Sequence, residues 1–233
     1  PMGLPAEAEN LVILIFAEQT NRTFLRHNIP VEGTLTNLPD ELVLQEQKLP
    51  SESDWAIVVE RCGHIFGESL SSLIKGSTVA GMSVSIKRRA SDGRAAAQSL
   101  CEKLQDRLTK FHIDLKTSDR FQTATATNSL LEKIHAGSAE QVVSLLVSAH
   151  IATSAPAMGE CIRKAYTMAG VLEGTNWEIF DAIGKLTDDR KSVAETLRAS
   201  VAKALQQDEH VMALGPVLKE SQLRAVRLLT ESQ

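Results

Sequence analysis

The sequence predicts an all-α protein in which a long helix precedes an antiparallel helical bundle. Apolar residues recur at steps of three and four through most of the chain, which is the spacing of a buried helix face. Aromatic residues make up only 4% of the 233 residues, a low share for a β-sandwich or barrel. The exception is a short irregular segment near residues 27–50, which contains Pro30, Gly33, Pro39 and Pro50. The run at residues 42–49, which alternates apolar and polar residues for part of its length, predicts one short strand there.

The apolar run "NLVILIF" near the start is too short to cross a membrane, which takes roughly 20 apolar residues. Glu7 and Glu9 precede it, where a signal peptide carries Lys or Arg. Pro5 and these two acids suit the first turn of a helix. We expect a buried helix through Gln19, because a helix that is apolar on nearly all sides needs partners around most of its circumference. A buried strand is the alternative.

A second helix is predicted from Ser51 to Gly67. Ser51 can cap its first turn, where Glu52 and Asp54 suit the positive end of the helix dipole. Apolar residues then recur at helical spacing, and Gly67 suits the left-handed position that ends a helix.

The clearest element spans residues 77–111, where small or apolar residues recur on one face without interruption. Asp92 and Gly93 could divide it into two helices, because a mid-helix glycine costs about 1 kcal/mol relative to alanine. The unbroken period favours one long or kinked helix of roughly 50 Å. Ala90, Gly93 and Ala97 make the middle of the stripe small, so a neighbouring helix can approach closely there.

Successive helices follow from residue 118 onward, and their short connections should make neighbours antiparallel. The expected caps and first-turn residues are Ser118 or Asp119, Thr153 or Ser154, Pro156, Asp188 and Pro216. Trp177, Phe180 and Ile183 should face the core with Leu172. A boundary near residues 111–119 would divide the chain into an N-terminal helical segment, 1–117, and a helical bundle, 118–233.

No motif predicts catalysis. Residues 72–75 fit the Ser-x-x-Lys motif of penicillin-recognising enzymes. The partial matches to the second and third motifs of these enzymes, at residues 91–92 and 116–117, are predicted to lie in helical surroundings instead of on a loop and a strand. Residues 75–78 lack the glycines of a phosphate-binding loop. Cys62 and His64 would point to different sides of a helix and would not share a metal. We therefore expect no enzyme activity, no cofactor and no metal. Three scattered cysteines without a secretion signal are typical of reduced thiols in the cytoplasm.

One charged feature suggests a binding surface. The chain has a net charge of -4, yet residues 77–111 carry seven basic and three acidic side chains. Lys87, Arg88, Arg89 and Arg94 could contact nucleic-acid phosphates or an acidic partner. The alternative is a solvated helix face whose charges are partly paired.

Five stretches carry a resemblance to a known family: "TNLPDELVLQEQKLPSESDW", "ATATNSLLEKI", "ATSAPAMG", "NWEIFDAIGKLTDDR" and "LGPVLKESQLRAVRLLT". Together they resemble the C-terminal part of large bacterial phage-resistance ATPases of the PglY kind, found in BREX-type defence systems. The resemblance covers nearly the whole chain. In such proteins the phosphate-binding loop lies far upstream, so the resemblance carries over no catalytic residue.

The resemblance implies a non-catalytic helical module that docks other protein subunits of a cytoplasmic defence complex. It implies no contact with a membrane. The alternative is a DNA-binding module that uses the basic face of the helix at residues 77–111.

Overall fold

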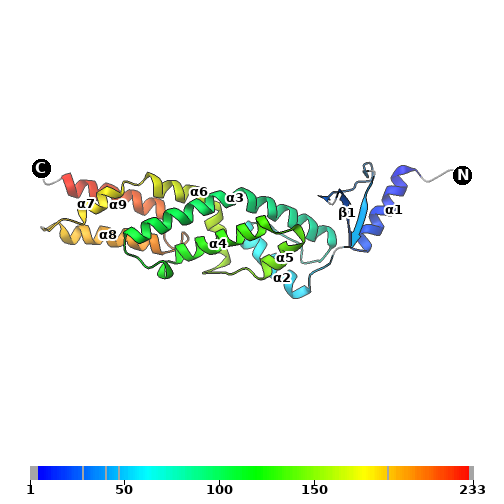
Figure 1. Cartoon of the computed structure of the whole chain (residues 1–233), viewed down its shortest axis with the longest axis horizontal. Helices are drawn as coiled ribbons and strands as arrows, with labels where there is room; N and C mark the ends of the chain where they lie inside the picture. Colours follow the sequence, from blue (N-terminus) through cyan, green and yellow to red (C-terminus); the bar gives the residue numbers. More distant parts are fainter. Residues whose placement is uncertain (1–4, 28, 40, 47, 188, 231–233) are drawn as a thin grey trace.

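The computed structural model describes residues 5–27, 29–39, 41–46, 48–187 and 189–230. It confirms the predominantly α class (Figure 1). The helices are α1 (Ala6–Gln19), α2 (Glu52–Arg61), α3 (Gly76–Lys110), α4 (Asp119–Ala136), α5 (Val142–Val147), α6 (Ala155–Gly174), α7 (Trp177–Ile183), α8 (Lys191–Gln206) and α9 (Leu214–Thr230). The strands are β1 (Arg22–Arg26), β2 (Ile29–Pro30) and β3 (Val43–Glu46). Short helical turns occur at η1 (Cys62–Phe66, π), η2 (Leu115–Thr117, 3-10) and η3 (Ala139–Gln141, 3-10).

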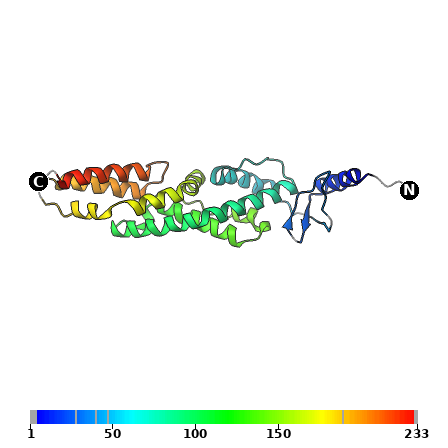
Figure 2. The same ribbon diagram turned by 90° about the horizontal axis from the view of Figure 1, so that it is seen from above.

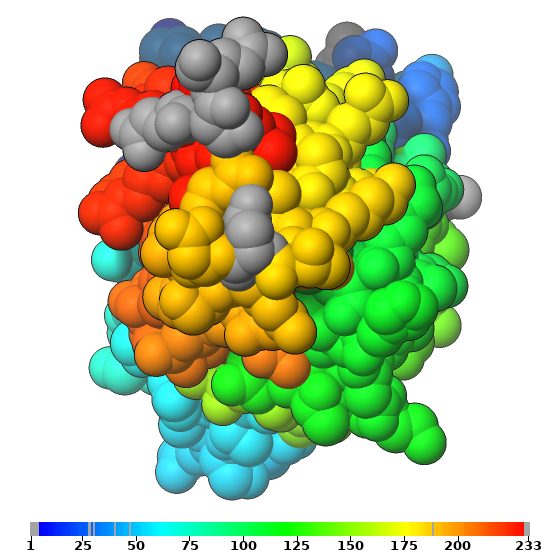
Figure 3. Space-filling model, turned by 90° about the vertical axis from the view of Figure 1, so that its left-hand side faces the viewer, coloured from blue at the N-terminus to red at the C-terminus, as the bar shows by residue number. Residues whose placement is uncertain are grey.

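The molecule is elongated, with α1 and the small sheet at one end and α7–α9 at the other (Figures 1 and 2). Helix α3 runs between these ends and packs along α4 and α6. Figure 3, viewed from the end that carries α7–α9, shows these later helices in yellow to red against the green α3 and α4. The long axis of the protein therefore follows α3.

Helix α3 is continuous over 35 residues, as the period predicted. Its N-terminal half, including Met82 and Ile86, joins a core cluster with α2, η1, α4 and α5. Its C-terminal half, including Leu100, Leu104 and Leu108, joins a second cluster with α6–α9. Because one helix contributes to both clusters, the core does not divide at the expected boundary between residues 117 and 118. That division stays a prediction.

Serine caps begin three of the helices, as the sequence predicted. The hydroxyls of Ser51, Ser118 and Ser154 each accept a hydrogen bond of 3.1 Å from a backbone N–H in the first turn. Each bond satisfies one of the N–H groups that a helix start leaves without an intrahelical partner. Asp188, the expected cap of α8, lies outside the described residues.

Strand β3 forms within the run at residues 42–49, as predicted, whereas β1 and β2 were not predicted from the sequence. Three short strands form an antiparallel sheet in the order β2-β1-β3, and Thr23 of β1 pairs with Gln45 of β3. These strands are two to five residues long. Strand β2, with two residues, is too short to show the two-residue alternation that indicates a strand in a sequence.

The first helix forms where the sequence predicted, but the expectation that it is buried was wrong. Val12 is 60% exposed, Leu11 and Ile15 are about half exposed, and Ala17 is the one buried residue of α1. Helix α1 packs on β1 at the end of the molecule, and its Glu18 carboxylate accepts a hydrogen bond of 3.2 Å from Ser77 at the start of α3. The apolar sequence of α1 favours burial, but the described residues cover only one side of the helix.

A close contact between α6 and η1 predicts a strong effect of one methyl group. A side chain at Gly159 would collide with the backbone carbonyl of His64, which cannot rotate away. Gly159→Ala should therefore destabilise the fold by about 3 kcal/mol in urea unfolding. Gly170→Ala, on the same helix with open space around it, is the matched control and should be neutral or slightly stabilising. Equal stability of the two variants would show that α6 and η1 do not pack this closely.

Candidate functional site

Two of the basic residues of α3 donate hydrogen bonds to backbone carbonyls at the ends of nearby helices. Lys87 Nζ donates a hydrogen bond to the carbonyl of Gly137, the residue after α4. Arg89 donates to the carbonyl of Phe66 at 3.0 Å and lies 3.4 Å from the carboxylate of Glu68. Cations suit these positions because the carbonyls at a helix C-terminus lack intrahelical partners.

The other two basic residues differ in their environment. Arg94 lies 3.4 Å from the Glu132 carboxylate on α4, whereas Arg88 is exposed and makes no ion pair with a described residue. In a helix, residues 87 and 94 lie on one side and residues 88 and 89 on others. The structure therefore distributes the four bases among several neighbours and does not bring them together as one patch.

The most exposed apolar surface lies on α1. We define the α1 surface as the partly exposed side chains of Leu11, Val12, Ile13, Ile15 and Phe16. Ile29 and Val43 of the adjoining sheet are also more than 60% exposed. Contiguous apolar side chains at the surface of a folded domain mark contact sites for other proteins. The run "LVILIF" carried this signal in the sequence, but its apolar character predicted an internal core instead.

A buried ionic junction ties the start of α4 to the connection between α8 and α9. The Arg120 side chain is 2% exposed and lies 2.6 Å from the carboxylate of Glu209. The guanidinium also donates to the carbonyls of Ala204, at 2.9 Å, and Met212, at 2.5 Å. Burial lowers the pKa of Arg120, and the hydrogen bond with Glu209 opposes that change. The junction satisfies carbonyls that would otherwise be buried without donors.

The sequence did not predict this junction, because Arg120 lies more than 80 positions before the residues that it contacts. One local signal was present. Arg120 occupies the first turn of α4, where the helix dipole disfavours a cation, so the residue needs a nearby carboxylate.

The cysteines are poorly suited to nucleophilic chemistry. Burial raises the pKa of Cys62 and Cys161 to about 12 and that of Cys101 to about 11. The thiolate, which is the reactive form, is therefore scarce at neutral pH. Across the described part of the chain, no group of three or more His, Cys, Asp or Glu side chains is placed to hold a metal ion. No described helix combines the length and apolarity needed to cross a membrane.

The fold and the α1 surface define a helical-bundle domain with an exposed apolar helix at one end. The family model described as the BREX System ATPase PglY protein 6th domain matches residues 59–233, and the chain belongs to this family. The chain is thus part of a phage-defence protein, and the resemblance seen in the sequence is confirmed. No solved structure matches the chain. The matched region begins within α2, so the whole α1 surface precedes it.

Proposed function

We propose that this chain is a non-catalytic docking module of a phage-defence ATPase, and that the α1 surface is its contact with the neighbouring part of that ATPase. The observation that carries the proposal is the row of partly exposed apolar side chains on α1, which precedes the matched domain, the sixth of its family, together with the small sheet. The sequence has no glycine-rich phosphate-binding loop, which supports a non-catalytic role.

The size of the α1 surface supports a contact within one assembly. Fully burying one large aliphatic or aromatic side chain contributes about 1.5–3 kcal/mol, so covering five half-exposed ones contributes about 4–7 kcal/mol. Association of two free proteins costs about 4–15 kcal/mol in lost freedom of motion. The α1 surface alone therefore gives a weak contact between separate chains. It gives a stable contact when the partners are already held together.

The test mixes the purified chain with the remaining domains of a PglY-type ATPase and measures affinity by calorimetry. A Val12→Glu/Ile15→Glu variant should bind at least about tenfold more weakly, because it places two charges in an apolar interface. Val193→Glu/Leu223→Glu is the matched control, because these residues are 49% and 57% exposed on α8 and α9. Loss of affinity in both variants, or in neither, would contradict the assignment of α1.

The DNA-binding alternative gives a separate expectation. If Arg88 alone of the four α3 bases is free to meet phosphate, the log–log dependence of duplex affinity on salt should have a slope of about -1 at most. A titration at low and moderate salt, with wild type and a Lys87/Arg88/Arg89/Arg94→Glu variant, measures this slope. Micromolar binding with a slope near -3 to -4, lost in the variant, would favour a nucleic-acid interface over docking.

A further inference from the structure

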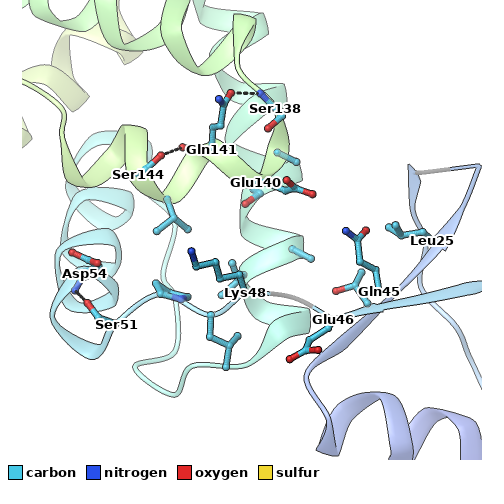
Figure 4. A pocket seen from close by; sticks show the side chains of 18 residues that line it. Leu25, Gln45, Glu46, Lys48, Ser51, Asp54, Ser138, Glu140, Gln141 and Ser144 are labelled. Carbon is cyan, nitrogen blue, oxygen red and sulfur yellow. Dashed lines mark hydrogen bonds between the residues drawn. The ribbon is translucent and has the colours of Figure 1, made fainter.

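A large cavity separates the small sheet from the helical bundle. Its volume is about 920 Å³, which is within the range of ligand-binding sites. The walls come from β1, β3, the start of α2, the start of α3, and the segment from η3 to α5 (Figure 4). The cavity is distinct from the α1 surface, because no residue of α1 lines it.

The cavity contains a polar group without a protein partner. Ser83 of α3 lines it and is only 3% exposed. Its hydroxyl makes no hydrogen bond with any of the described residues. The hydroxyl is not among the fully enclosed polar atoms without a partner, so it is open to the cavity. A ligand in the cavity can therefore hydrogen-bond to Ser83.

The charges around the cavity indicate the sign of that ligand. Glu46, Asp54 and Glu140 line it, against the single cation Lys48. None of the three carboxylates forms an ion pair with a described residue. In Figure 4, Glu140 extends from η3 toward the sheet, and Gln45 extends from β3 on the opposite wall. An excess of unpaired carboxylates disfavours a phosphate-bearing ligand and favours a cationic one.

The sheet beside the cavity offers backbone groups to the same ligand. In the order β2-β1-β3, strand β3 pairs with β1 on one side, and its other edge pairs with no described strand. An unpaired edge is a template for an added strand, and β-strand addition is a common mode of peptide recognition. Gln45 and Glu46 of β3 also line the cavity, so strand edge and cavity adjoin.

We propose that this cavity and the free edge of β3 form a binding site for an extended basic segment of a partner protein. The segment adds to β3 through its backbone and places a lysine or arginine side chain in the cavity. There the cation meets Glu46 and Glu140 and donates a hydrogen bond to Ser83. This site is separate from the contact proposed for α1, and either can fail without the other.

The experiment uses the full chain and a short fluorescent peptide in which threonine and valine alternate around two arginines. A matched peptide carries glutamates in place of the arginines. The arginine peptide should bind, and the glutamate peptide should bind at least about tenfold more weakly. Hydrogen exchange of backbone amides in β3 should slow when the arginine peptide is added, because an added strand protects outward-facing N–H groups.

Variants separate this site from general attraction to an acidic protein. Glu46→Gln/Glu140→Gln should weaken binding about tenfold, and Ser83→Ala about threefold. Ser83→Ala should leave thermal stability unchanged, because the hydroxyl has no partner to lose. Glu178→Gln, a surface substitution on α7 far from the cavity, is the control and should change nothing. Equal binding of the two peptides, unchanged affinity in the double variant, or unprotected β3 amides would each overturn the proposal.

Discussion

Replacing Trp177 with alanine should lower the free energy of unfolding by about 3–5 kcal/mol. The indole is 9% exposed, and its N–H donates to the carbonyl of Leu172 at 2.8 Å. The ring meets Phe111 edge-on with centroids 5.7 Å apart, and the guanidinium of Arg107 lies 4.8 Å from its centre. Trp177→Ala therefore leaves a cavity, frees a buried carbonyl and removes an anchor between α3 and α7.

Denaturant unfolding followed by circular dichroism measures this loss. Tyr166→Ala is the matched control, because Tyr166 is 84% exposed on α6 and its removal opens no cavity. The control should change stability by less than about 0.5 kcal/mol. A loss below about 1 kcal/mol for Trp177→Ala would place the indole at the surface instead.

Arg120→Ala should destabilise the protein by a similar amount, about 3–5 kcal/mol. The substitution leaves the Glu209 carboxylate, which is 10% exposed, without its main cation in a poorly hydrated site. It also leaves the carbonyls of Ala204 and Met212 without the donors that Arg120 supplies. The cost arises from these unpaired groups more than from the attraction that is lost.

The ion pair between Arg224 and Glu220 provides a control with the same separation between the charged atoms. Its atoms are also 2.6 Å apart, but both side chains are about two-thirds exposed. Arg224→Ala should therefore cost less than about 0.5 kcal/mol in the same unfolding measurement. The double variant Arg120→Met/Glu209→Gln should recover part of the lost stability, because it removes the unpaired charge. If Arg120→Ala and Arg224→Ala had equal effects, burial would not govern this junction.

The helical elements were predictable because their signals are local. A serine cap, a three-to-four residue period and a glycine or proline at the ends are all visible within one helix. The prediction that a neighbouring helix approaches closely at the small residues of α3 is also confirmed, since Gly93 lies opposite Leu131 and Ile162 of α4 and α6. The order of the helices and the continuity of α3 followed from these patterns.

The candidate sites were less predictable because they depend on groups distant in the sequence. The basic residues of α3 formed one cluster in the sequence, yet the fold turns them toward Gly137, Glu68 and Glu132. The cavity beside Ser83 requires the three-stranded sheet, of which the sequence predicted only the strand within residues 42–49. The apolar run of α1 was correctly predicted to form a helix, but its expected burial was wrong. The sequence alone could not show which elements would cover it.

The continuity of α3 has a mechanical consequence. Its first residue, Gly76, lies against the backbone of Asn21 beside the sheet, and Lys75 just before it forms a 2.7 Å ion pair with Glu18 of α1. Over a lever of about 50 Å, a tilt of about 10° at the α1 end would move the α8–α9 end by about 9 Å. A small rotation at the α1 end would thus become a displacement of several ångströms at the opposite end, far larger than the reach of a hydrogen bond.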